Sequence, residues 1–296
     1  VVHLHNVYHQ LSPVIIKYFK DAGIPVVMTL HDFYVVSPNY SLYHQGQSVS
    51  VKQSIRQLIL EKQIKNSFWI SVVAAIIHKR DRQFYKMCDR FISPSGYLAG
   101  IVSDSYPHVP VEIMPNFIRQ EEVSADGDYI FYGGRISPEK GVNILLQAAA
   151  VLPQYKFKIA GDGPLFDQWR QEYQLSNVEW LGRQTPSAVQ DLLRHCRAAV
   201  LPSLWAENCP LILLESLAIG KPVLASDMGG ISEIVDDNGN GLLFTAGDVN
   251  ELVLAIEDIY DNSIYSHLRK GAISSASKYD AETYGEKIIS FYEQII

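Results

Sequence analysis

The chain has 296 residues, which is enough for two domains of ordinary size. Its 47% hydrophobic and 19% charged content excludes a disordered chain and indicates a full apolar core. The net charge of -7 argues against a nucleic-acid partner, and the longest apolar run, residues 68–77, is shorter than the roughly 18 residues of a membrane-spanning helix.

Three cysteines, Cys88, Cys196 and Cys209, are scattered and have no metal-ligand spacing. An odd number of isolated cysteines indicates a reducing compartment and no zinc site, so we predict a cytoplasmic protein. The chain has no initial methionine and opens directly in an apolar segment. Because a sheet that begins in this way would leave an edge unpaired, we expect that an N-terminal portion is missing.

Apolar segments predict a parallel sheet in the first part of the chain. Strands at 1–4 and 25–30 flank an amphipathic helix at 13–22, and this order is typical of a parallel strand pair. His31 directly follows the second strand, at the carboxyl end where open α/β sheets bind ligands. A histidine there is quite often structural and bonded to a backbone carbonyl; we favour a functional role.

Residues 34–90 carry the least regular pattern. Residues 34–50 predict a long loop, and 53–65 predict a helix with one apolar face. Nine Lys or Arg and three Asp or Glu between 52 and 90 give a local balance of +6 inside an acidic protein. One interpretation is an interfacial surface that meets anionic lipid or a charged acceptor. We favour the other, solvated helices whose apolar faces lie in the core, because amphipathicity alone does not discriminate.

After a strand at 111–118, the polar and acidic stretch 119–128 predicts a domain linker. A second run of alternating strands and helices follows it. Its strands are predicted at 129–132, 155–160, 178–183, 198–202, 222–226 and 241–244, and the final helix at 281–296. Two such runs predict an α/β protein with two parallel-sheet domains.

Two glutamates stand eight positions apart after a buried strand of the second run. Glu207 falls in the loop, and Glu215 lies about two turns into the following helix. Pro210 suits the first turn of that helix, where its missing N–H costs nothing. The N–H groups of Leu211 and Ile212 would then face outward from a strand's carboxyl end, where anions and nucleotides bind.

Glycine-rich turns follow two other strands of this run. In residues 133–141 the glycines allow close approach of the backbone to a ligand, and Arg135 and Lys140 add two cations. This segment is not a P-loop, because the lysine precedes its glycine. The Gly-Asp-Gly-Pro turn at 161–164 is weak evidence for a dinucleotide site, because the third glycine is absent.

Together these motifs resemble the C-terminal half of the retaining GT-B glycosyltransferases, the group 1 family (family 4). The matching pieces are 133–141, 160–164, Leu181-Gly182, the spacing from Glu207 to Glu215, 220–223, and Gly229-Gly230 followed by Glu233. They cover nearly all of residues 113–279, and the N-terminal part matches more loosely at 29–32 and 93–95. The resemblance implies a GT-B fold, in which two Rossmann-like, doubly wound parallel-sheet domains face a cleft.

The resemblance also implies a domain division. Residues 1–120 would form a partial acceptor-side domain, with the C-terminal helix 281–296 packing back on it. Residues 127–280 would form the domain that binds the nucleotide-sugar donor. The family's N-terminal domain begins with a strand and a glycine-rich loop, and this sequence does not contain them.

Each matched position acquires a role from the resemblance. Arg135 and Lys140 would hold the pyrophosphate of the donor and offset charge on the departing nucleoside diphosphate. Glu215 would accept hydrogen bonds from the ribose, Glu207 would contact hydroxyls of the transferred sugar, and His31 would face that sugar near the reacting centre. The other donor-binding positions are Gly134, Gly161, Gly163, Leu181, Arg183, Asn208, Pro210, Leu211 and Ile212. No metal ion or cofactor is expected, because cations and helix N–H groups stabilise the leaving group.

The implied activity is that of a retaining hexosyltransferase of polysaccharide biosynthesis. A UDP-sugar is preferred over a GDP-sugar as donor, and a glycan or lipid-linked saccharide of the cell envelope is the expected acceptor. Residues 52–90 could hold the protein at the inner face of the membrane. A glycosidase fits poorly, because eight helical residues span about 12 Å along an axis and do not flank one sugar bond. A nucleotide-sugar-binding or scaffold protein without transfer activity stays open as an alternative.

Overall fold

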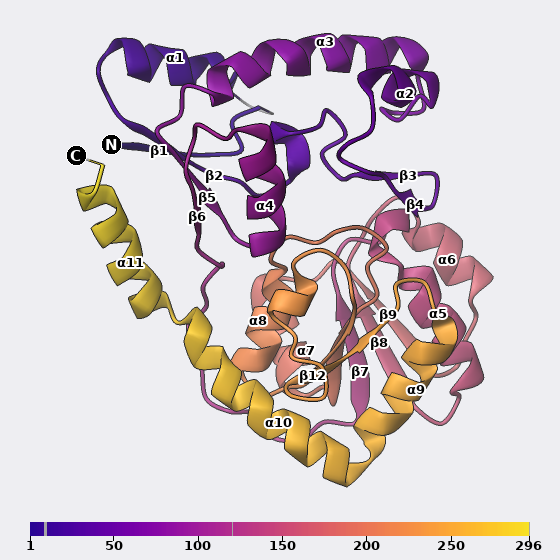
Figure 1. Ribbon diagram of the computed structural model, residues 1–296. Coiled ribbons are helices and arrows are strands. Elements are labelled where there is room, and N and C mark those ends of the chain that lie inside the picture. Colours follow the sequence, from indigo (N-terminus) through magenta and orange to yellow (C-terminus); the bar gives the residue numbers. More distant parts are fainter. Residues whose placement is uncertain (9–10, 120, 296) are drawn as a thin grey trace. The chain divides into compact units, whose positions relative to one another are not determined.

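The computed structural model describes residues 1–8, 11–119 and 121–295, which form two compact units (Figure 1). The first unit comprises Val1–Pro115 and Glu282–Ile296, and the second comprises Asn116–Ala281. The boundary therefore precedes the linker predicted at 119–128. The reason is that the Asn116 side chain donates to the Cys209 carbonyl, and Ile118 pairs with Asp280, so residues 116–118 are tied into the second unit.

The first unit is built on a four-stranded parallel sheet in the order β1-β2-β5-β6. The strands are β1 Val2–His5, β2 Val26–Thr29, β5 Arg90–Ser93 and β6 Val111–Ile113. The helices of this unit are α1 Val14–Asp21, α2 Ile55–Leu60, α3 Phe68–Tyr85, α4 Gly96–Ser105 and α11 Ala281–Glu293. All four residues of β2 are buried, as expected for an inner parallel strand.

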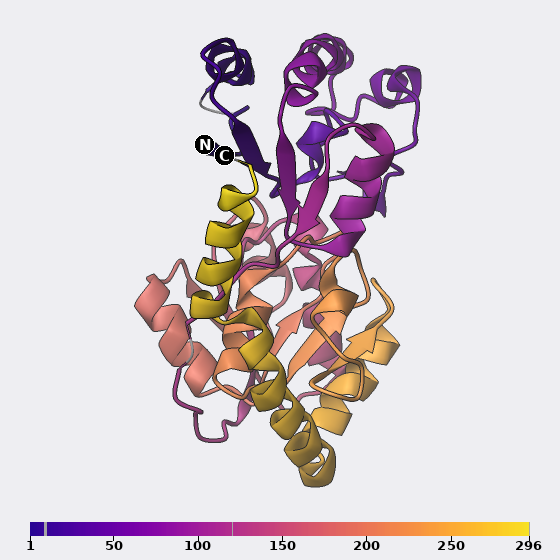
Figure 2. The same cartoon turned by 60° about the vertical axis from the view of Figure 1, so that its left-hand side comes forward.

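The C-terminal helix α11 packs on this sheet. Its Phe291 joins a buried cluster with Val27, Ile92 and Met114. The His3 ring, near the start of the chain, lies 2.5 Å from the hydroxyl of Tyr292. Figures 1 and 2 accordingly draw the two ends of the chain side by side. The last helix of the sequence is thus part of the core of the first unit.

The segment between β2 and β5 departs from the sequence-based expectation in two places. The predicted loop at 34–50 contains a 3-10 turn, η1 (Phe33–Val35), and a short antiparallel hairpin made of β3 (Tyr43–His44) and β4 (Gln47–Ser48). The helix predicted at 53–65 is only α2, because Lys62 adopts a left-handed backbone conformation that a helix cannot continue. The long helix of the segment is α3.

Two histidines, the partly buried His3 and the buried His78, make the first unit sensitive to acid. The His3 Nε2 atom lies 2.6 Å from the Thr29 hydroxyl, and burial, with His5 and His31 nearby, lowers the pKa of His3 to about 4. His78 lies on the buried side of α3, with Nε2 2.8 Å from the Tyr34 carbonyl. Burial lowers the pKa of His78 to about 4 as well. Both imidazoles are therefore neutral in the folded protein at neutral pH.

We expect the first unit to lose stability when the pH falls from 7 to 4.5. In the unfolded chain both histidines bind a proton near their ordinary pKa of 6.5, whereas in the folded chain they do so only near 4. The contribution of the two neutral histidines to the free energy of unfolding has its full value above about pH 6.5 and decreases as the pH falls toward 4. For His78 alone the loss at pH 4.5 is about 2–3 kcal/mol. Hydrogen exchange of α3 peptides at both pH values, corrected for intrinsic rates, measures the loss. The variant His78→Gln can still donate to the Tyr34 carbonyl and should show a flatter pH dependence; an unchanged slope would contradict the assignment.

The second unit contains a six-stranded parallel sheet in the order β12-β11-β10-β7-β8-β9. Its strands are β7 Tyr129–Gly133, β8 Lys156–Ala160, β9 Val178–Gly182, β10 Ala198–Leu201, β11 Val223–Ser226 and β12 Gly241–Phe244. Its helices are α5 Val142–Val151, α6 Phe166–Glu172, α7 Pro186–Arg194, α8 Leu211–Ala218, α9 Val249–Tyr260 and α10 Asn262–Ala276, with 3-10 turns η2 Pro138–Lys140, η3 Ile231–Glu233 and η4 Ser277–Tyr279. Successive strands run outward from β7 in one direction and from β10 in the other. The order of the sheet therefore reverses between these two neighbours.

The central strand β7 shows why this sheet is covered on both faces. Its first four residues are apolar and buried, and their side chains alternate in direction along the strand. Ile130 and Tyr132 pack into one core cluster with residues of α5 and α9, whereas Tyr129 and Phe131 pack into a second cluster with residues of α7 and α8. The predicted mixed α/β fold with parallel sheets is confirmed. Among the described residues, no helix is long and apolar enough to cross a bilayer.

Candidate functional site

The candidate site lies where the strand order of the second unit reverses. Strands β7 and β10 are parallel neighbours, with Ala198 opposite Ile130, so their carboxyl ends meet at the same edge of the sheet. The loops that follow them touch, because the Leu204 N–H donates to the Glu139 carbonyl at 2.8 Å. A reversal of this kind opens a crevice above the strand ends, which is where open α/β sheets bind nucleotides.

Glu207 is the centre of a hydrogen-bond cluster at this edge. Its side chain is almost fully buried, at 8% exposure, and its Oε1 accepts from Lys140 Nζ at 2.7 Å. The same oxygen accepts from the Ser203 hydroxyl at 2.7 Å and the Trp205 indole N–H at 2.8 Å. The Lys140 ammonium also lies 4.8 Å from the centre of the Trp205 ring. Three donors on one oxygen hold the carboxylate and the ammonium group in fixed positions.

Sequence reasoning had given Ser203 and Trp205 no role. They stand four and two positions before Glu207, in a loop whose other members are largely apolar. Polar donors that precede a buried carboxylate so closely are the signal that could have found them. Their contribution is to position Glu207.

Arg135 differs from Lys140 in its surroundings. Its side chain is exposed and forms no ion pair with any residue in the described parts of the chain. Its backbone carbonyl accepts from the Tyr132 hydroxyl at 2.7 Å, and Tyr132 is fully buried, so the loop is anchored from below. Lys140 is thus already paired within the protein, whereas Arg135 offers an uncompensated positive charge at the same edge.

The glycines of the site are required by contact between loops. A Cβ atom at Gly141 would lie 1.8 Å from the Pro202 carbonyl oxygen, and one at Gly161 would lie 1.8 Å from the Gly134 carbonyl oxygen. Gly141 also has a positive φ of 65°. The sequence had suggested that glycines bring the backbone close to a ligand; in the structure their first effect is to bring the loops after β7, β8 and β10 together.

The first turn of helix α8 contributes backbone N–H groups. Pro210 is the N-cap residue with an extended backbone, one position before the first-turn position predicted for it, and no described side chain caps the helix. Ile212 lies against the end of β7, since a Cβ at Gly133 would lie 3.3 Å from its Cδ1 atom. The N-terminus of α8, with its partial positive charge, therefore meets the same strand end as Arg135 and Lys140.

Glu215 lies one turn further along α8 and is half-buried. Burial, and to a lesser extent the nearby Glu121 carboxylate, raises the pKa of Glu215. It has no hydrogen-bond partner among the residues that the structure describes. A carboxylate that is desolvated in this way is stabilised by any ligand hydroxyl that donates to it.

The remaining predicted positions separate into three groups. Gly134, Gly163 and Asn208 belong to the loops described above. Leu181 and Arg183 lie at the end of β9, two strands away from β7 at the edge of the sheet, or about 10 Å from it. His31 belongs to the first unit and follows β2, as predicted.

His31 is part of a short chain of histidines. Its Nε2 atom lies 2.8 Å from His5 Nδ1, and the two rings stack with centres 5.1 Å apart. Burial, followed by the effect of His5, lowers the pKa of His31. The histidine is therefore neutral at neutral pH and can accept or donate a hydrogen bond. Within the described residues, no group of three or more His, Cys, Asp or Glu side chains is placed to hold a metal ion.

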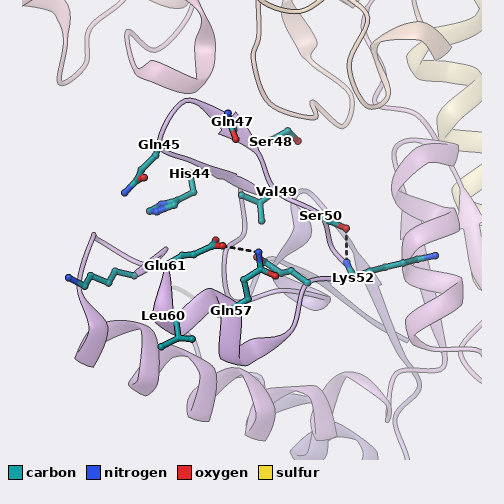
Figure 3. Close-up of a pocket in the computed structure, with 12 residues that line it drawn as sticks. His44, Gln45, Gln47, Ser48, Val49, Ser50, Lys52, Gln57, Leu60 and Glu61 are labelled. Atoms are coloured by element: carbon teal, nitrogen blue, oxygen red, sulfur yellow. Dashed lines mark hydrogen bonds between the residues drawn. The ribbon is translucent and has the colours of Figure 1, made fainter.

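A polar hollow of about 940 Å³ lies in the first unit between the β3–β4 hairpin and α2 (Figure 3). The carboxylate of Glu61 accepts from Gln57 and Gln63 at 2.8 and 2.7 Å, and these bonds lower the pKa of Glu61. Sequence reasoning passed over this hollow, although five glutamines between residues 45 and 63 were the available signal. It contains none of the predicted site residues, and its amide groups bond largely to one another.

The second unit coincides with a known sequence family. The family model described as "Glycosyl transferases group 1" matches residues 115–279, more than half of the chain. An uncharacterized glycosyltransferase of Methanocaldococcus jannaschii is 30% identical over 219 residues, which cover 71% of this chain and 61% of that relative. The chain belongs to the group 1 glycosyltransferase family, which confirms the resemblance seen in the motifs. It spans about three fifths of the length of that relative.

Solved structures of similar fold match more of the chain than the family model does. Sucrose-phosphate synthase from Thermosynechococcus elongatus superimposes with a TM-score of 0.75 at 19% identity, over 99% of this chain and 73% of the other. HepE from Anabaena, solved in complex with UDP, has a TM-score of 0.71 at 21% identity, over 95% of this chain and 76% of the other. The predicted GT-B fold class is confirmed by these similarities.

Proposed function

We propose that the protein transfers a hexose from a nucleoside-diphosphate sugar to a glycan or lipid-linked saccharide, with retention of configuration. The observation that carries the proposal is the convergence at one strand end. There the Lys140–Glu207 pair, the exposed charge of Arg135 and the first-turn N–H groups of α8, which no described side chain caps, meet within the second unit. This combination suits a dianionic diphosphate next to a neutral sugar.

The donor would be held by the residues of this edge. Its diphosphate binds Arg135 and Lys140 and accepts from the N–H groups of Leu211 and Ile212. The ribose hydroxyls donate to Glu215, whose raised pKa reports a carboxylate in need of donors. The base lies toward the backbone around Leu181 and Arg183, on the β9 side of the reversal.

The same residues would act on the reaction itself. As the bond from the anomeric carbon to the diphosphate breaks, negative charge grows on the phosphate oxygens, and fixed cations and N–H dipoles stabilise that charge. Glu207 orients the sugar through its hydroxyls, and its bond to Lys140 fixes the ammonium group at the leaving group. The acceptor hydroxyl attacks from the face that the diphosphate leaves, which retains the configuration. This scheme assigns no step to a metal ion.

We further propose UDP as the donor nucleotide, ahead of GDP. The support is the similarity to HepE, which was solved with UDP and with UDP-glucose. His31, neutral because of its lowered pKa, would bond a hydroxyl of the transferred sugar. The acceptor would be a glycan or lipid-linked saccharide of the cell envelope, met by the first unit on the cytoplasmic side of the membrane.

Calorimetric titration of UDP, GDP and ADP into the chain, with EDTA present, tests this proposal. UDP is expected to bind, and Glu215→Ala should raise its Kd by roughly 10–100-fold, because a charge-assisted hydrogen bond to the ribose is lost. Glu257→Ala, at an exposed position of α9, serves as the matched control. Binding of none of the three nucleotides to folded protein would contradict the donor site. Tight UDP binding without release of UDP from UDP-sugars would instead support a binding or scaffold protein.

A further inference from the structure

Helix α3 places its polar residues inside and its apolar residues outside. Its buried side chains are Ser71, Ala75, His78, Asp81 and Tyr85, three or four positions apart along one face. Two polar groups of this face have partners inside, since His78 bonds the Tyr34 carbonyl and Asp81 accepts from the Tyr34 hydroxyl at 3.1 Å. The buried Tyr85 hydroxyl has no hydrogen-bond partner among the described residues. The core thus takes the polar side of the helix. The interpretation favoured from sequence, in which its apolar face lies in the core, is wrong for α3.

The opposite face is an exposed apolar surface. Six large apolar side chains within ten successive residues are exposed: Phe68, Trp69, Ile70, Val73, Ile76 and Ile77. Trp69 and Ile76, two turns apart, reach 74% and 64% exposure. The stretch is about 15 Å long. A concentration of this kind on an otherwise ordinary surface marks an interaction site, whereas isolated exposed apolar residues need no explanation.

Neighbouring helices enlarge this surface. Figures 1 and 2 both draw α1, α2 and α3 along the same side of the first unit. Tyr18 of α1 is 73% exposed and Leu60 of α2 is 61% exposed. We define the α3 face as the six apolar residues of α3; Tyr18 and Leu60 are further exposed apolar side chains on the adjoining helices.

The charges around the α3 face are positive. Lys62 and Lys65 precede the helix, Lys79 and Arg80 follow the apolar stretch, and all four are exposed. Two of the three carboxylates between residues 52 and 90 are engaged by cations, Asp81 by Arg80 and Asp89 by Lys20. An apolar strip with cations at both ends thus lies on a chain whose net charge is -7.

We infer that the α3 face docks on an anionic lipid surface. Exposed Trp and Ile side chains suit the boundary between headgroups and acyl chains, and long lysine side chains beside them reach anionic headgroups. A second copy of the chain fits less well, because a two-fold contact through this face would bring two positive rims together. The inference rests on the proposed function, for which it identifies the lipid-linked class of acceptor.

Sedimentation with 100 nm vesicles tests this inference. The chain should bind vesicles of phosphatidylcholine with 30% phosphatidylglycerol, and bind pure phosphatidylcholine vesicles much more weakly. The double variant Trp69→Ser/Ile76→Ser should lower the apparent affinity at least about tenfold. The triple variant Lys62→Gln/Lys65→Gln/Lys79→Gln should bind anionic and neutral vesicles alike, and added salt should no longer weaken its binding. The matched control is Leu254→Ser/Ile289→Ser, which removes two apolar side chains of 60% and 59% exposure from α9 and α11.

Equal vesicle binding by the double variant and the control would overturn the inference. So would a concentration-dependent dimer in analytical ultracentrifugation that only the double variant abolishes, because that result would identify a second copy as the occupant. UDP titration of the same variants separates this inference from the proposed function. If the double variant loses vesicle binding and keeps its UDP affinity, both the lipid inference and the proposed donor site are supported. If it keeps both vesicle binding and UDP affinity, the lipid inference is wrong and the proposed donor site stands.

Discussion

Replacing Lys140 by methionine should lower the kcat for release of UDP from a UDP-sugar by roughly 10²–10³-fold. The Lys140 side chain is 22% exposed and its ammonium group is held by Glu207 at 2.7 Å, so it acts on the leaving diphosphate from a fixed position with limited access of water. Methionine has a similar length and shape but no charge. The expected loss is larger in kcat than in UDP affinity, because the charge on the leaving group grows in the transition state.

The matched control for this variant is Lys156→Met. Lys156 is a lysine of the same unit that pairs with Asp128 at 2.6 Å, and both side chains are 68% exposed. An exposed pair of this kind contributes little to stability, and the control should keep wild-type kcat. Similar activity of Lys140→Met and Lys156→Met would contradict the assignment of Lys140. A loss confined to KM would show that Lys140 binds the donor without acting in the reaction.

Replacing Glu207 by alanine should lower the free energy of unfolding of the second unit by about 2–4 kcal/mol. The change removes the one oxygen that accepts from Lys140, Ser203 and Trp205. Three donors at a largely buried site would then lack their acceptor, and one of them carries a charge. Urea denaturation followed by the fluorescence of Trp205, with the other tryptophans replaced by phenylalanine, measures the effect.

Two comparisons make this prediction specific. Glu207→Gln keeps an acceptor oxygen without the charge, so it should cost less stability than Glu207→Ala. In a double-mutant cycle with Lys140→Met, the two substitutions should couple by about 0.5–3 kcal/mol. Additive effects would show that the ion pair does not contribute to stability, and the proposed fixed position of Lys140 would lose its basis.

The strands of the second unit and the chain positions of its proposed site residues could be predicted from sequence, because they depend on local patterns of apolar residues and turns. Apolar runs, and at 155–160 an alternation of polar and apolar residues, predicted the six strands of its sheet and their order along the chain. The helix predicted to follow Glu207 and to contain Glu215 forms as α8. His31 lies two positions after β2, at the end of the apolar run that predicted the strand.

The Lys140–Glu207 contact could not be predicted from local rules. The two residues are 67 positions apart, and they meet because β10 inserts beside β7 and not beside β9. That choice depends on which faces of all the helices can be buried together. The same holds for Ser203 and Trp205, whose role appears only once a charged oxygen is placed between them.

By itself, the sequence determined the family, the class of fold and the chain positions from which the proposed donor site is built, because strand periodicity, glycine turns and motif spacing are local properties. Tertiary structure alone decided which charges pair at the strand ends and which side of α3 faces the solvent. Both sides of α3 contain residues that a core could accept, so periodicity could not choose between them. The choice followed from the partners available inside: Tyr34 offers a hydroxyl and a carbonyl to Asp81 and His78, and these polar contacts turn Trp69 and Ile76 outward.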